Sequence, residues 1–145
     1  MGADKIRLAK ENVDSFNSGD WDRFRTQYNP DGVYDEVATQ RRILGPDAVI
    51  EVGKGWRKAF PDAKGTVIRA IESGDTVALE VVWEGTHTGP LESPQGTIPP
   101  SGKRIRMPGA LFVSFKNDKI AENKHFFDLM TMLAQIGAIP APATA

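Results

Sequence analysis

The segment Thr66–Glu84, TVIRAIESGDTVALEVVWE, alternates between apolar and polar residues in both of its halves. In the second half Val77, Leu79, Val81 and Trp83 fall on one side, the spacing of a strand that buries one face. The two halves are separated by Ser73-Gly74-Asp75, which has the composition of a tight turn. The segment therefore predicts two adjacent antiparallel strands.

Upstream of this segment the apolar residues recur at steps of three and four, which is the spacing of amphipathic helices. The pattern predicts one helix over residues 6–16, a short second helix over residues 20–28 and a third over residues 46–60. Between the second and third helices, Val33–Ala38 has the composition of a short strand.

Downstream, Arg104–Phe115 and Lys119–Phe127 read as two further strands, followed by a closing helix from about Asp128 to Ile136. The segment Pro90–Pro100 holds four prolines and is longer than a usual hairpin loop, so it is expected to be a lid or an interface element.

Helices followed by a meander of strands indicate an α+β fold, in which helices lie across one face of a curved antiparallel sheet and leave a cavity open at one end. We expect one domain over residues 1–138 and a flexible tail over residues 139–145.

Composition excludes several classes of function. The chain of 145 residues has a net charge of −1, so no basic field is present to attract nucleic acid or an anionic membrane. It has no cysteine and two histidines, His87 and His125, in no metal-binding spacing. No signal peptide, membrane span, nucleotide-binding loop or serine-nucleophile elbow is recognisable. The expectation is a cytoplasmic protein that uses no metal and no cofactor.

Asp128 is the first candidate catalytic residue because it stands in the apolar run Phe126-Phe127-Asp128-Leu129-Met130. A carboxyl group held away from water has a raised pKa and can exchange protons near neutrality. The alternative is a helix N-cap, since an acid suits the positive end of the closing helix. The two roles are compatible, and the residues alone leave both open.

The histidines give weaker signals. His87, in WEGTHTGP just after a strand, is interpreted either as a loop residue or as an acid/base group at a pocket mouth. His125 shares a strand face with Asn123 and Phe127, whereas Lys124 and Phe126 share the other, and both faces mix polar and apolar residues. The alternation does not reveal which face lines a cavity, and a structural role is favoured for His125.

Aromatic residues supply the candidate lining of an apolar site, although such residues more often fill a core. The expected ligand-binding residues are Trp56, Trp83, Phe112, Lys124 and Phe126.

Four stretches together resemble the SnoaL-like polyketide cyclase family of the nuclear transport factor 2-like superfamily. They are AFPDAKG, GDTVALEVVWEGTHTGPL, PPSGKRI and DKIAENKHFFDLMTMLAQIG, and the resemblance covers about residues 5–138. It implies a cone-shaped half-barrel, usually a homodimer, with an apolar pocket between sheet and helices. It also implies that an aspartate near the end of the last strand, here Asp128, is the general acid/base of an intramolecular aldol closure. The preceding strand, where cyclases of the family carry a histidine, has none here, and His87 is the residue that would reach the same space from its loop.

The first hypothesis is therefore a cofactor-free enzyme that acts on a small apolar carbonyl compound, with Asp128 moving a proton and His87 assisting. The second is an isomerase or hydratase of the ketosteroid isomerase type that uses Asp35 or Glu36 in the same pocket. The third is a non-catalytic protein that binds a hydrophobic small molecule.

Overall fold

The computed structural model describes residues 4–93 and 96–140. The helices are α1 (Lys5–Ser18), α2 (Trp21–Gln27), α3 (Pro46–Ala59) and α4 (Leu129–Gln135), with a 3₁₀ turn, η1, at Val37–Thr39. The strands are β1 (Tyr28–Glu36), β2 (Arg41–Leu44), β3 (Lys64–Ser73), β4 (Thr76–Thr86), β5 (Leu91–Ser93), β6 (Gly96–Ile98), β7 (Arg104–Lys116) and β8 (Lys119–Phe127). The expected α+β class is confirmed.

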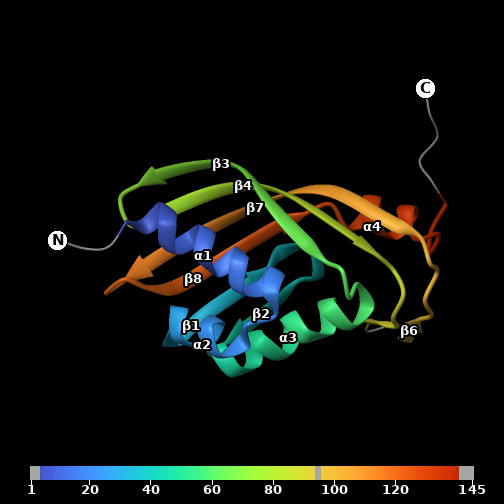
Figure 1. Ribbon diagram of the computed structural model, residues 1–145, viewed down its shortest axis with the longest axis horizontal. Helices are drawn as coiled ribbons and strands as arrows, with labels where there is room; N and C mark the ends of the chain where they lie inside the picture. The colour runs from blue at the N-terminus through green and yellow to red at the C-terminus, as the bar shows by residue number, and fades with distance from the viewer. Residues whose placement is uncertain (1–3, 94–95, 141–145) are drawn as a thin grey trace.

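The main sheet has six strands in the order β2-β1-β8-β7-β4-β3, and helices α1, α2 and α3 lie together on one side of it (Figure 1). The β3–β4 hairpin predicted from Thr66–Glu84 is present, with Ser73 paired to Thr76 around the turn. β8 spans Lys119–Phe127, as the sequence predicts.

The sheet is mostly antiparallel, as expected, with one exception: β1 runs parallel to β8. These two strands are far apart in the chain, so no hairpin turn imposes their direction. The strand predicted at Val33–Ala38 also begins earlier, at Tyr28, and it shifts register against β8 between Tyr28 and Val33. A bulge of this kind hides the alternation that sequence reading depends on.

Local chemistry explains the helix ends. The Asp4 carboxylate accepts hydrogen bonds from the backbone N–H groups of Ile6 and Arg7 at the start of α1, and Gly19, with φ of 69°, ends it in the left-handed conformation. Asp20 caps α2 in the same way. α3 begins at Pro46, where the missing N–H group costs nothing.

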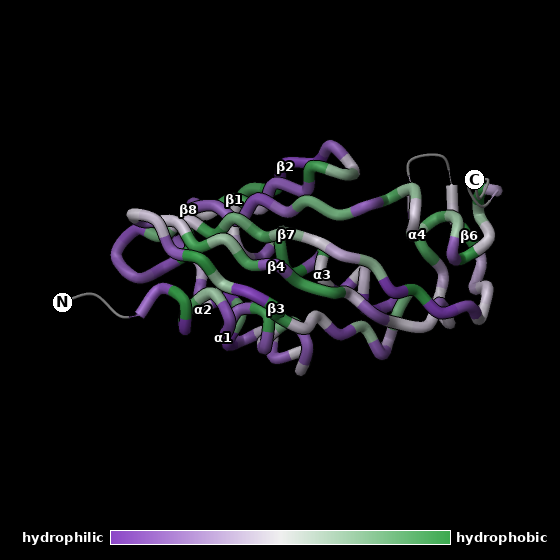
Figure 2. The backbone as a smooth tube through the Cα atoms, turned by 90° about the horizontal axis from the view of Figure 1, so that it is seen from above, coloured by the Kyte–Doolittle hydropathy of each residue, from purple (hydrophilic) through white to green (hydrophobic). Residues whose placement is uncertain are grey.

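The buried apolar residues form two clusters. One, which includes Val13, Ile50 and Val81, packs α1, α2 and α3 against the inner face of the sheet. The other, which includes Phe60, Met107 and Met132, lies toward α4 and β5. Trp83 contacts both clusters. Figure 2 shows the sheet from above, with the edge strands β2 and β3 on opposite sides of the strands between them.

The proline-rich segment predicted as irregular contains the short β5–β6 hairpin, in which Leu91 pairs with Ile98. Residues 94–95 and 141–145 lie outside the described part of the chain, and the predicted flexible tail falls mostly there. No helix in the described residues has the length and apolar character that crossing a membrane requires.

Candidate functional site

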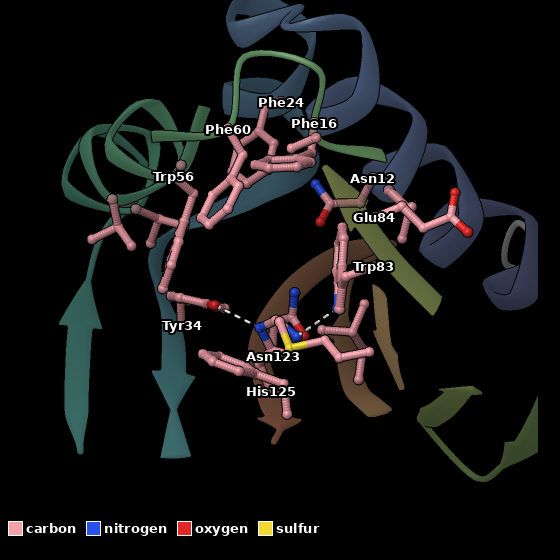
Figure 3. A pocket seen from close by; sticks show the side chains of 18 of the residues that line it. Asn12, Phe16, Phe24, Tyr34, Trp56, Phe60, Trp83, Glu84, Asn123 and His125 are labelled. Atoms are coloured by element: carbon pink, nitrogen blue, oxygen red, sulfur yellow. Dashed lines mark hydrogen bonds between the residues drawn. The ribbon is translucent and has the colours of Figure 1, made fainter. Parts of the chain in front are cut away.

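A mostly apolar cavity of about 110 Å³ lies between the inner face of the sheet and the helices (Figure 3). For scale, a cavity of roughly 150 Å³ holds benzene. Most of its lining is aromatic and aliphatic. The polar and charged side chains in the lining are those of Asn12, Tyr28, Tyr34, Trp56, Trp83, Glu84, Asn123 and His125.

His125 lies in this lining with both ring nitrogens hydrogen-bonded. The indole Nε1–H of Trp83 donates to Nε2 of His125 across 3.0 Å, so Nε2 carries a lone pair. The proton of the neutral ring is therefore on Nδ1, which lies 2.7 Å from the hydroxyl oxygen of Tyr34. Both bonds are drawn in Figure 3.

The chain of hydrogen bonds continues to a buried carboxylate. With Nδ1–H of His125 donating to Tyr34, the Tyr34 hydroxyl donates its own proton to Oε2 of Glu36 across 2.7 Å. The donors thus all point the same way, from Trp83 through His125 and Tyr34 to Glu36. We call these four residues the relay. They come from β4, β8 and β1.

Glu36 is fully buried, yet each oxygen of its carboxylate accepts two hydrogen bonds. Besides Tyr34, the indole of Trp56 donates to Oε2 at 2.9 Å, while Thr39 and Arg41 donate to Oε1 at 2.5 and 2.8 Å. Burial raises the pKa of Glu36, but these hydrogen bonds and the Arg41 charge outweigh it and hold the pKa below its ordinary value. The relay therefore ends on a negative charge.

Burial also shifts the pKa values of His125 and Tyr34, the other two titratable residues of the relay. It lowers the pKa of His125 to about 4, and the nearby Glu36 charge opposes only part of that effect. Burial, followed by the Glu36 charge, raises the pKa of Tyr34 well above its ordinary value. At neutral pH the site consequently holds a neutral imidazole, a protonated phenol and an ionised carboxylate.

Two glycines fix the orientation of the Trp83 indole. A Cβ atom at Gly65, the residue paired with Trp83 on β3, would lie only 2.5 Å from the indole ring. A Cβ atom at Gly109 on β7 would lie 3.0 Å from Nε1 of Trp83. The ring thus fills space that side chains at these positions would occupy.

The predicted environment of Asp128 is wrong. Its side chain is exposed and is absent from the cavity lining. It is the N-cap of α4, accepting from the Thr131 hydroxyl at 2.6 Å and the Thr131 backbone N–H at 3.0 Å. These hydrogen bonds lower its pKa, whereas the acid/base hypothesis needed a raised one. The apolar neighbours that suggested burial do not bury the carboxylate, and two of them, Phe126 and Met130, are themselves 39% and 66% exposed.

His87 does not reach the cavity either. It is fully buried against the ring of Phe60, with centroids 5.3 Å apart, and its Nδ1 is paired with the hydroxyl of Ser101 at 3.0 Å. Burial lowers its pKa. The Ser101 backbone N–H also donates to Nδ1 at 3.2 Å, so His87 ties the start of the β4–β7 connection to its end.

The structure divides the five expected ligand-binding residues. Trp56 and Trp83 line the cavity, whereas Phe112, Lys124 and Phe126 do not. Phe112 and Phe126 are 43% and 39% exposed on the outer face of the sheet, with ring centroids 5.8 Å apart. The Lys124 ammonium lies 5.7 Å from the Phe126 ring. The strand parity was right, but the choice of inner face needed the packed helices.

Sequence reasoning did not identify Tyr34 and His125 as residues of the site. The sequence offered one signal, that His125 shares a strand face with Asn123. The structure shows that this face is the buried one. Of the two acids considered on the early strand, Glu36 joins the relay, whereas Asp35 faces the other way, 3.6 Å from Arg42. Among residues 4–93 and 96–140, no cluster of three His, Asp or Glu side chains has an arrangement that could hold a metal ion.

Known proteins of the same architecture support the fold. IdmH from Streptomyces antibioticus is 26% identical with a TM-score of 0.79, over 93% of this chain and 99% of IdmH. AclR from Streptomyces galilaeus is 24% identical with a TM-score of 0.80, over 96% of this chain and 84% of AclR. A protein from Catenulispora acidiphila with a ketosteroid isomerase-like fold, solved with trimethylamine, is 19% identical with a TM-score of 0.78, over 95% of this chain and 97% of that one.

No functionally curated protein matches the chain. The family model described as SnoaL-like polyketide cyclase matches residues 6–136, which is nearly the whole of the described structure. The chain therefore belongs to the SnoaL-like polyketide cyclase family.

Proposed function

We propose that this protein is a cofactor-free enzyme that moves a proton on a small, mostly apolar carbonyl compound, with His125 as the general base. The observation that carries the proposal is the directed relay, in which a buried imidazole lining the cavity is backed through Tyr34 by the charge of Glu36. A base held by a third group that fixes its tautomer is the usual arrangement of an activated acid/base pair. His125 and Glu36 replace Asp128 and His87 in this role.

The chemical step begins with the opening of the Trp83–His125 hydrogen bond when a ligand enters. Nε2 of His125 is then free to take a proton from the carbon next to the ligand's carbonyl group. The ring becomes an imidazolium, which the Tyr34 oxygen and the Glu36 charge stabilise. The freed indole N–H of Trp83 can donate to the developing enolate oxygen. Returning the proton to another carbon completes an isomerisation and restores the neutral ring.

Two properties of the site limit the substrate. A cavity of about 110 Å³ accommodates about one small ring, so a multi-ring polyketide would require the helices to move. A base with a pKa of about 4 removes only activated protons. Such protons lie between two carbonyl groups, or between a carbonyl group and a double bond.

The test uses cyclohex-3-enone, which is small and has such a proton. Its conversion to the conjugated cyclohex-2-enone is followed by ultraviolet absorbance. Wild-type protein is expected to accelerate the conversion over buffer, His125→Gln to abolish the acceleration, and Tyr34→Phe to lower kcat with little change in KM. Heptane-2,6-dione, which closes to 3-methylcyclohex-2-enone with loss of water, has only protons next to a single carbonyl group. Because so weak a base does not remove such protons, its closure is expected to stay at the rate in buffer. Equal rates of cyclohex-3-enone conversion for wild type and His125→Gln would refute the proposal.

A binding protein without chemistry is the second candidate, and one observation favours it. Both nitrogens of His125 and both oxygens of Glu36 already have partners inside the protein, as in a polar network that only stabilises a core. Saturable binding of cyclohex-3-enone with no turnover, in wild type and His125→Gln alike, would favour this second function.

We also propose that two copies of the chain pair through the outer face of the sheet. Phe112 and Phe126 are exposed there, and the Phe126 ring contacts the Phe112 ring and the Lys124 ammonium across β7 and β8. Exposed aromatic residues of this kind are enriched at protein interfaces. The partner proposed is a second copy because the family resemblance implies a homodimer.

A further inference from the structure

Asn123 is a second polar group of the cavity, and the relay does not use it. It precedes His125 by two positions on β8, so the two side chains share the inner face of the sheet. Asn123 is 5% exposed. Its Oδ1 has no hydrogen-bond partner, and its Nδ2 makes one long bond of 3.4 Å, to the hydroxyl of Tyr28.

An unpaired amide oxygen in a buried cavity is unfavourable unless something else satisfies it. Buried polar side-chain atoms in native proteins nearly always have a partner. Nε2 of His87 is the other buried side-chain atom without a partner among the described residues, but it does not line the cavity. Of the two, the amide of Asn123 is the one that a molecule in the cavity can reach.

The amide also restricts the kind of group that would pair with it. In the orientation observed, the oxygen is unpaired and needs a donor. If the amide turned over, its oxygen would accept from Tyr28 and its NH₂ group would need an acceptor. A hydroxyl group is both donor and acceptor, so it satisfies the amide in either orientation. A carbonyl or an ether oxygen is only an acceptor, so it satisfies the amide only in the turned orientation.

We propose that Asn123 binds a hydroxyl group of the substrate, and hence that the substrate is a hydroxylated carbonyl compound. This rests on the proposed function only in assigning the carbonyl end to His125. Alternate residues on one strand face are separated by about 7 Å. A cyclic alcohol carrying its carbonyl group across the ring has its two polar groups at about that separation. Asn123 would therefore determine specificity, without taking part in the proton transfer.

The test compares phenol with toluene, two single-ring molecules of similar size that differ by a hydroxyl in place of a methyl group. Dissociation constants are measured by isothermal titration calorimetry on the full chain, for wild type, Asn123→Leu and His125→Gln. The quantity compared is the ratio of the toluene constant to the phenol constant. Asn123→Leu is expected to lower this ratio about tenfold, the effect of one lost hydrogen bond, whereas His125→Gln leaves it within about threefold.

A second measurement covers the case in which Asn123→Leu does not fold. In wild-type protein labelled with ¹⁵N, phenol is expected to shift the side-chain NH₂ resonances of Asn123 more than toluene does. A ratio unchanged by Asn123→Leu, a ratio lowered by His125→Gln instead, or no phenol binding to wild type would each overturn the proposal. None of these readouts requires turnover, so the proposed proton transfer can fail while the hydroxyl site stands, and the reverse.

Discussion

The side chains of Trp83 and His125 meet across a strand that lies between their own. Trp83 is on β4 and His125 on β8, and β7 separates these two strands in the sheet. Gly109 on β7 leaves the room for this contact, because a Cβ atom there would lie 3.0 Å from Nε1 and 3.1 Å from Cδ1 of Trp83. The contact that holds Nε2 of His125 thus depends on a residue with no side chain.

Gly109→Ala is expected to move the indole N–H away from His125. The new methyl group would also lie 3.1 Å from the backbone oxygen of Phe126, so relieving the contact would require the backbone of β8 to shift. We expect a loss of about 1–3 kcal/mol in the free energy of unfolding, typical of overpacking, and at least about a tenfold loss of cyclohex-3-enone turnover. Gly55→Ala is the matched control, because a Cβ atom at Gly55 in α3 meets nothing within 4 Å. Unchanged turnover in Gly109→Ala would show that the indole position is irrelevant.

Glu36→Gln tests the charged end of the relay. Tyr34 and Trp56 donate to one oxygen of Glu36, and Thr39 and Arg41 donate to the other, so an NH₂ group at either place faces donors. We expect the variant to lose about 3 kcal/mol of stability and most of its turnover, because the imidazolium loses its counter-charge. Asp35→Asn, one position earlier on the opposite face, should keep wild-type turnover. Equal turnover in the two variants would remove Glu36 from the mechanism.

Asp128→Ala is expected to leave turnover of cyclohex-3-enone unchanged. The carboxylate is exposed and its two oxygens are used by Thr131 at the start of α4, so its loss affects the cap of that helix. The expected change is a lower melting temperature, measured by circular dichroism, and Asp128→Asn should reduce it less because asparagine also caps helices. A collapse of turnover in a folded Asp128→Asn variant would restore the carboxylate to a catalytic role.

Stability is expected to fall as the pH drops from 7 to 5. The pKa of His125 is about 4 in the folded protein and about 6.5 when unfolded, so between these values the unfolded chain binds more protons. The stabilisation is fully present above pH 6.5 and is lost as the pH falls toward 4, by about 2 kcal/mol at pH 5. The lowered pKa of His87 acts with the same sign. Urea unfolding at both pH values, in wild type and His125→Gln, measures the His125 share. An equal pH dependence in the two proteins would show that burial does not lower the pKa of His125.

Phe126→Glu is expected to produce a monomer. The side chain points outward, so a charge there disrupts a face-to-face pairing of two sheets while the inner core is untouched. Sedimentation velocity at several concentrations compares it with wild type, and Lys10→Glu, an exposed substitution on α1 at the helix side of the sheet, serves as the control for an added negative charge. A wild-type protein that sediments as a monomer would refute the pairing.

Much of the fold follows from local patterns in the sequence. The alternation of Thr66–Glu84, the turn at residues 117–118 and the bounds of β8 all follow from the period of two and from turn composition. The three N-terminal helices follow from their apolar spacing and their caps. These features depend on residues within a few positions of one another.

The site depends on contacts that no local pattern contains. His125, Tyr34 and Trp83 come from three strands whose order in the sheet is set by the parallel pairing of β1 with β8, and the sequence carries no turn that specifies it. Asp128 also shows that neighbours along the chain do not determine burial, since its apolar neighbours do not surround its carboxylate in space. The sequence by itself determined the helices, the β3–β4 and β7–β8 hairpins and which residues of β4 and β8 share a strand face. Only the tertiary structure decided which face is inside, because burial depends on what the helices cover.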